Sequence, residues 1–125
     1  SPSELIGKAA GLYRGAFLDE GEAELPKATA MVESLRRRLL RHLLRVGQQC
    51  ERAHPQEAVD WYEEALRVDP CADDACRSLM TVYQRLDRST DVAATYQRCR
   101  AALAAAQGLA PSAATQGIFR TLSAR

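Results

Sequence analysis

The chain has 125 residues, of which 46% are hydrophobic, and its 17 Lys and Arg against 16 Asp and Glu leave a formal net charge of +1. This length fits one domain, and it is long enough to bury a core without disulfides or metal ions. So balanced a charge gives no overall attraction to nucleic acid, because a nucleic-acid-binding domain usually has a pI above about 9.

No stretch of the chain predicts export or insertion into a membrane. No apolar run approaches the roughly 18 residues of a membrane-spanning helix, and Ser1–Glu4 lacks the basic start of a signal peptide. We therefore expect residues 1–125 to form a single cytoplasmic domain without a membrane partner. The missing initiator Met indicates that this domain is a fragment of a larger protein.

Residues 1–13 predict a helix, because a Ser-Pro start suits the cap and the first position of a helix. Residues 14–24 predict a loop that contains two large apolar residues, Phe17 and Leu18. We expect both to pack back into the core. The alternative is an exposed tip that docks a partner.

A long helix is predicted over residues 26–52, with its apolar residues on one face at 100° per residue. A basic cluster lies within Arg36–Arg45, and its members Arg38, Arg41 and Arg45 fall on the opposite side. We expect this cluster to be a solvated surface. The alternative is a contact with an acidic partner or with the phosphate backbone of DNA. Aromatic residues do not interleave with the arginines, which argues against stacking on a single strand.

The helix predicted over residues 57–69 organises the rest of the chain, and Pro70 ends it. A small, a large and a small residue share one of its faces at i, i+4 and i+7: Ala58, Tyr62 and Ala65. A shift of 34 residues finds a second apolar set: Val92, Tyr96 and Cys99. About 34 residues is the period of the tetratricopeptide repeat. The sequence therefore predicts an all-α, tetratricopeptide-like right-handed superhelix of about six helices in helical hairpins.

The remaining helices are predicted over residues 73–86, 92–107 and 112–122. Asp87–Asp91 is expected to be a hairpin loop in which Thr90 caps the next helix. That helix should end at Gly108, with Leu109 adding an apolar contact. Ser112 should cap the last helix, which we expect to cover the open end of the stack.

The predicted repeat pattern assigns partner binding to one helix. The polar positions that would line the inner groove of the stack, counted from Asp73 as the first repeat position, are Asp74, Arg77, Thr81, Gln84 and Arg85. These five residues are our candidates for contact with a partner in that groove.

No residue pattern supports catalysis, so we expect a protein that is not an enzyme and has no catalytic, metal or cofactor residues. The sequence neighbours Glu63–Glu64 and Asp73–Asp74 point about 100° apart on a helix and do not converge. The four cysteines and two histidines complete no metal-ligand spacing. We expect free thiols in a reducing compartment. A Cys71–Cys76 redox pair is the alternative.

Several segments together resemble one known family. They are Gly11–Leu18, Ala65–Pro70 running on to Arg77–Met80, Tyr96–Arg100, and Leu109–Ser112 followed by Thr115. In this order they are similar to the bacterial transcriptional activator domain of SARP-type antibiotic-pathway regulators and of related multidomain regulators with ATPase modules. The chain departs from the family at Met31–Glu33, where Trp before Val is common, and at Thr115, where an acidic residue is usual.

The resemblance implies a stack of tetratricopeptide-like helix pairs that normally follows a winged helix-turn-helix domain. It also implies a regulatory role through protein contact: self-association, or contact with adjacent domains of the parent regulator or with transcription machinery. Specific DNA binding is expected only through the separate domain. Two alternatives stay open, a generic peptide-binding scaffold and an auxiliary contact between Arg36–Arg45 and the DNA backbone.

Overall fold

A computed structural model describes residues 2–3 and 25–124 of the chain. Five helices make up the longer segment: α2 (Leu25–Cys50), α3 (Pro55–Val68), α4 (Asp73–Arg85), α5 (Ser89–Gln107) and α6 (Ala113–Ser123). No strand occurs in these residues, and the expected all-α class is confirmed. Residues 2 and 3 are helical. The remainder of the helix expected over residues 1–13, and the loop with Phe17 and Leu18, lie outside the described residues.

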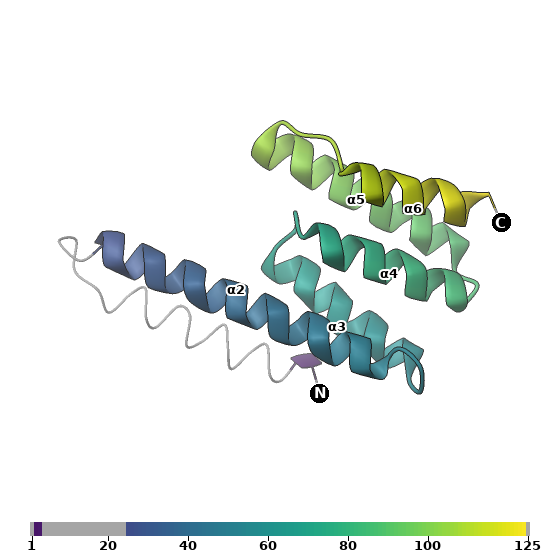
Figure 1. Cartoon of the computed structure of the whole chain (residues 1–125), viewed down its shortest axis with the longest axis horizontal. Helices are drawn as coiled ribbons and strands as arrows, with labels where there is room; N and C mark the ends of the chain where they lie inside the picture. The colour runs from purple at the N-terminus through teal and green to yellow at the C-terminus, as the bar shows by residue number, and fades with distance from the viewer. Residues whose placement is uncertain (1, 4–24, 125) are drawn as a thin grey trace.

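The helices stack in two layers, because short turns reverse the chain after each of the first four. In Figure 1, α2, α4 and α6 form the front layer, and α3 and α5 lie behind them. The substantial contacts among these helices join α2 to α3, α3 to α4, α4 to α5, and α6 to both α4 and α5. Each helix therefore packs on its near neighbours in sequence, as expected for helical hairpins.

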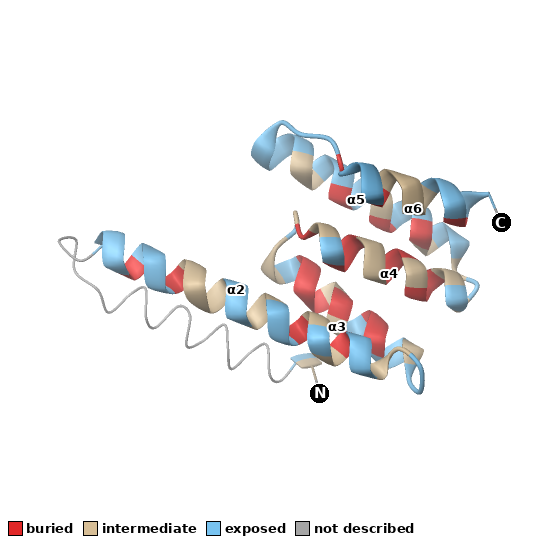
Figure 2. Ribbon diagram, viewed as in Figure 1, coloured by how far each residue is buried: buried red, intermediate tan, exposed pale blue. Residues whose placement is uncertain are grey.

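The 34-residue shift in the sequence is matched by the positions of α3 and α5. α5 begins at Ser89, 34 residues after Pro55, the first residue of α3. Both matched sets face the interior: all but the half-buried Tyr96 are buried among Ala58, Tyr62, Ala65, Val92, Tyr96 and Cys99. In Figure 2 the buried residues of α3 and α4 recur along the helices where the two layers meet.

α2 and α3 are in close contact at Gly47. A Cβ atom built on Gly47 would lie 2.5 Å from Cε1 of Tyr62, much closer than atoms can pack. The Tyr62 ring is 0% exposed, and its hydroxyl donates a hydrogen bond of 2.5 Å to Glu51. Burial and the bond to Glu51 raise the pKa of Tyr62 well above its ordinary value. The glycine is therefore what allows an anchored aromatic ring to sit between the two helices.

Two predicted helix ends are confirmed. Gly108 has φ 64° and ends α5, its N–H donating to the carbonyl of Ala104 at 3.1 Å. Glycine adopts this left-handed conformation more readily than any other residue. Ser112 caps α6 by accepting a hydrogen bond from the N–H of Thr115 at 3.2 Å.

One prediction about the turn before α5 is wrong. Thr90 does not cap α5, which already begins at Ser89 and has no side-chain cap. The turn between α4 and α5 is shorter than expected, because Asp87 has φ 57° and the N–H of Arg88 donates to the carbonyl of Tyr83 at 2.9 Å. Leu109 is 57% exposed, and its N–H donates to the carbonyl of Leu103 at 3.4 Å. The apolar contact expected of Leu109 stays a prediction.

Candidate interaction surfaces

The five predicted groove residues lie together on one side of α4, away from its buried residues. At 100° per residue, Asp74, Thr81 and Arg85 fall within a narrow stripe, and Arg77 and Gln84 lie beside it. Asp74 and Arg85 are exposed, and the other three are half-buried. The five residues share one side of α4, and their role in binding a partner stays a prediction.

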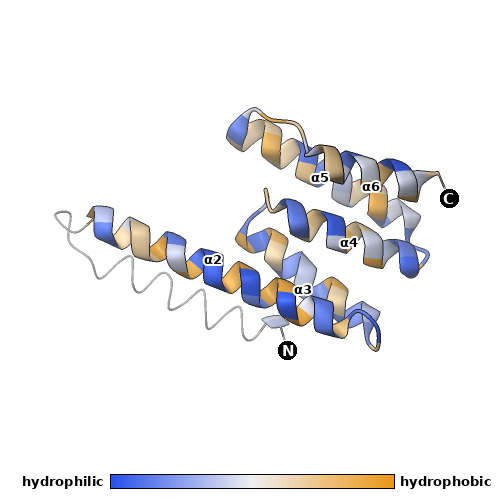
Figure 3. Ribbon diagram, viewed as in Figure 1, coloured by the Kyte–Doolittle hydropathy of each residue, from blue (hydrophilic) through white to orange (hydrophobic). Residues whose placement is uncertain are grey.

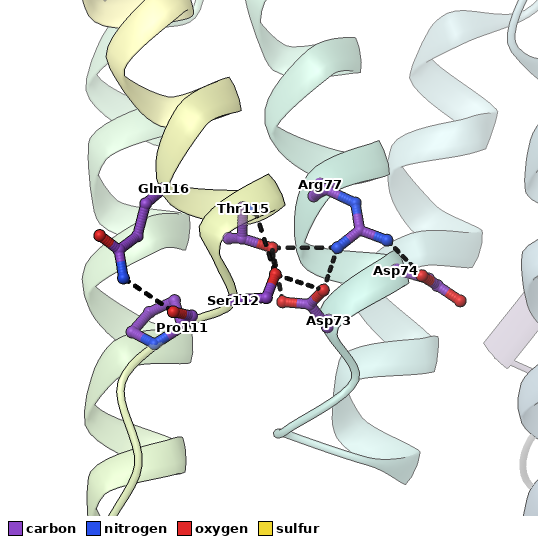
Figure 4. A network of polar contacts seen from close by, with 7 residues as sticks. All are labelled: Asp73, Asp74, Arg77, Pro111, Ser112, Thr115 and Gln116. Carbon is purple, nitrogen blue, oxygen red and sulfur yellow. Dashed lines mark hydrogen bonds and ion pairs between the residues drawn. The ribbon is translucent and has the colours of Figure 1, made fainter.

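Arg77 is committed to contacts inside the domain. It forms ion pairs with Asp73 and Asp74, and its Nη1 donates to the hydroxyl of Thr115 at 3.1 Å. Asp73 also accepts hydrogen bonds from Thr115 and, at 2.9 Å, from Ser112. Figure 4 shows these side chains converging where the first turn of α4 meets the first turn of α6. The network holds α6 onto α4, so Arg77 has little freedom to bind a partner.

The Asp73 carboxylate has a pKa below its ordinary value of 3.8. Burial alone would raise this pKa, but the hydrogen bonds from Thr115 and Ser112 and the charge of Arg77 outweigh that effect. Asp73 thus supplies a carboxylate to the start of α6.

The rest of the α4 face is less constrained. The Thr81 hydroxyl donates to the carbonyl of Arg77 at 2.9 Å. Arg85 lies 3.6 Å from the Glu51 carboxylate, and its side chain is 52% exposed. Exposed ion pairs of this kind contribute about 0–1 kcal/mol. Arg85 makes this one contact, whereas Arg77 contacts Asp73, Asp74 and Thr115, so Arg85 is the better probe of the groove.

A second polar cluster, on the other side of α4, was not expected from the sequence. Glu63 of α3 accepts a hydrogen bond from the Tyr83 hydroxyl at 2.9 Å, and pairs with Arg98 of α5 at 3.0 Å. Burial and the bond to Glu63 raise the pKa of Tyr83 to about 12. Glu64, its sequence neighbour, is buried and pairs with Arg67 instead. The two carboxylates have separate structural partners and do not converge, as their spacing predicted.

The predicted basic side of α2 is exposed. Arg38, Arg41 and Arg45 all face solvent, opposite the helix face that carries the buried Leu43 and Gly47. His42 is exposed beside them, and its ring lies edge-on to Trp61 with centroids 6.4 Å apart. Arg36 differs from these arginines, since it is half-buried and pairs with Glu33 at 2.8 Å.

A hollow of about 510 Å³ separates the outer parts of α2 and α5. Its walls are Arg36 of α2, the turn Asp69–Cys71, and the α5 residues Ala102, Ala106 and Gln107. Among the described helices, α2 and α5 are the longest, at 26 and 19 residues.

All four cysteines are free thiols, with Cys76 and Cys99 buried and Cys50 and Cys71 half-buried. A Cys71–Cys76 redox pair finds no support, because the Cys71 thiol points to the carbonyl of Ala102 at 3.6 Å. Cys76 instead meets Cys99 of α5, and this contact together with burial raises the pKa of Cys76. Across residues 2–3 and 25–124, His, Cys, Asp and Glu side chains form no group that could hold a metal ion.

None of the five described helices is both long and apolar enough to cross a membrane. The family model described as "Bacterial transcriptional activator domain" matches residues 2–122. The chain belongs to this family, as the resemblance had indicated. Comparisons with curated proteins and with solved structures gave no match.

Proposed function

We propose that this domain is a protein-interaction module that works within a larger bacterial transcription regulator. Its partner would be a second copy of itself, an adjacent domain of the parent regulator, or the transcription machinery. Membership of the transcriptional activator family supports the regulatory context. Its role would be contact in the cytoplasm rather than catalysis.

The tetratricopeptide-like interpretation is supported by the 34-residue offset between α3 and α5 and by the matching burial of their residues. In repeat proteins of this kind, each helix pair packs only on its neighbours, and the stack winds into a superhelix with an extended binding surface. The described helices show this pattern of neighbour contacts. We infer that α2, α4 and α6 line the inner surface of a right-handed superhelix.

The observation that carries the proposal is the polar, accessible face of α4. Asp74, Thr81, Gln84 and Arg85 lie on it, and none of them is fully buried. Such a face presents hydrogen-bond donors and acceptors on a rigid helix, which suits recognition of another protein surface.

The experiment measures the mass of the full 125-residue chain by light scattering over a concentration series. We expect a dimer whose fraction rises with concentration. The double variant Gln84→Glu with Arg85→Glu should lower that fraction. The same exchanges at exposed residues of α5, Gln97→Glu with Arg100→Glu, should leave it unchanged and serve as the matched control.

A monomer at every concentration would refute self-association by this domain alone. The two variant pairs then test the other partners in a transcription assay of the parent regulator. Loss of activation by the α4 pair but not by the α5 pair would support contact through α4. Equal activity of both pairs and the unaltered protein would refute it.

A further inference from the structure

The charge of the chain is unevenly distributed. α2 contains six Lys and Arg residues and one Glu, a net charge of +5, whereas the whole chain carries +1. The residues outside α2 therefore carry a net charge of −4. An almost neutral domain thus contains one strongly basic helix, which the overall pI conceals.

Four arginines define a basic face on α2: Arg37, Arg38, Arg41 and Arg45. At 100° per residue they fall within a 100° arc, and they extend over about 12 Å of helix. All four are exposed. Figure 3 shows hydrophilic segments recurring along α2.

The basic face is not neutralised within the described part of the chain. Arg37, Arg38 and Arg41 pair with no carboxylate there, and Arg45 contacts only His42, at 3.5 Å. Positions three and four residues from Arg41 bring other arginines, and like charges at this spacing destabilise a helix. A Glu three or four residues from Arg41 would instead stabilise the helix. An anionic partner would remove the repulsion.

We propose that the basic face binds the phosphate backbone of duplex DNA without reading its sequence. Guanidinium groups match phosphate geometry with paired N–H donors. Aromatic side chains that could stack on the bases of a single strand do not interleave with these arginines. The family places the domain in a transcription regulator, which works beside DNA. Backbone contacts position a protein on DNA but carry no sequence information.

The test uses the full chain and two fluorescent DNA duplexes of unrelated sequence, with binding followed by anisotropy over a salt series. Both duplexes should bind equally. The logarithm of the association constant should fall against the logarithm of the salt concentration with a slope of about −3 to −4, for four phosphate contacts. The variant Arg38→Gln with Arg41→Gln should reduce that slope by about 2.

The matched control removes the same charge elsewhere. Arg100→Gln with Arg120→Gln alters exposed arginines of α5 and α6 that have no ion pair among the described residues, and should leave the slope unchanged. Urea unfolding should show the variant Arg38→Gln with Arg41→Gln to be at least as stable as the unaltered chain, because the repulsion between neighbouring arginines is relieved. If the pair fails to fold, Arg41→Gln alone tests the same point, with a slope change of about 1.

Three results would overturn the proposal. The first is no binding of either duplex at low salt. The second is an equal loss of affinity in the control pair, which would mean that only net charge matters. The third is tighter binding of an oligo-glutamate peptide than of DNA, with the same dependence on Arg38 and Arg41, which would assign the face to an acidic protein.

Discussion

Exchanging glycine for alanine should have opposite effects on stability at two places in this fold. Gly47 and Gly117 both lie inside helices, α2 and α6. In an open helix position, alanine stabilises by about 0.5–1 kcal/mol, because glycine loses more backbone freedom on folding. A Cβ atom at Gly117 would meet nothing within 4 Å. Gly117→Ala should therefore stabilise the domain by about that amount.

Gly47→Ala should destabilise the domain. The added Cβ would lie 2.5 Å from Cε1 and 2.9 Å from Cδ1 of Tyr62. The ring has no room to move, because it is fully buried and bonded to Glu51. Overpacking of this kind costs about 1–3 kcal/mol, and a clash with an anchored ring belongs in the upper part of that range. After the helix gain is subtracted, about 1–2 kcal/mol of destabilisation remains.

Urea unfolding followed by circular dichroism measures both variants on the same scale. The fluorescence of Trp61, the only tryptophan, adds a local probe, since its ring contacts His42 of α2. Gly47→Ala should shift that fluorescence, and Gly117→Ala should not. If Gly47→Ala stabilised the domain as much as Gly117→Ala, the close approach of α2 and α3 would be refuted.

Two further predictions concern the polar junctions. Thr115 is only 1% exposed, and Thr115→Val keeps the shape of its side chain but removes its hydrogen bonds with Asp73 and Arg77. This variant should lower the free energy of unfolding by about 1.5–3 kcal/mol. The control Thr121→Val, on the exposed side of α6, should lower it by less than about 0.5 kcal/mol. Folding lowers the pKa of Asp73 from 3.8, so the stability that Asp73 contributes is present above pH 3.8 and is lost as the pH falls through the folded pKa. The destabilisation by Thr115→Val, measured by urea unfolding, should therefore shrink in acid. A destabilisation that does not depend on pH would contradict the network. Glu63→Gln should lower the pKa of Tyr83 from about 12, because the adjacent negative charge disappears, and NMR titration of the ring measures it. Tyr83 holds its proton more tightly in the folded state, so the stability that it contributes is lost as the pH rises from its ordinary pKa of 10 to about 12. A Tyr83 pKa that is unchanged in Glu63→Gln would refute the contact with Glu63.

Features that depend on neighbouring residues were predicted correctly from the sequence. The apolar faces of the helices, the cap at Ser112 and the left-handed Gly108 all follow from spacing within a few residues. The exposed position of Arg38, Arg41 and Arg45 follows from the same periodicity. Local sequence also identified the face of α4 that carries the candidate groove residues. It did not fix the turn at Asp87, where a backbone bond to Tyr83 outweighed the preference of Thr90 for a cap.

Only the tertiary structure decided which side chains meet across helices. Nothing near Gly47 in the sequence shows that Tyr62 will pack against it, although a lone glycine inside a helical pattern is a signal for close packing. Glu63 became a bridge to Tyr83 and Arg98, while its neighbour Glu64 did not, because only one of them faces α4 and α5. Periodicity assigns a residue to a face of its helix. The partner on that face is set by how separate helices pack together.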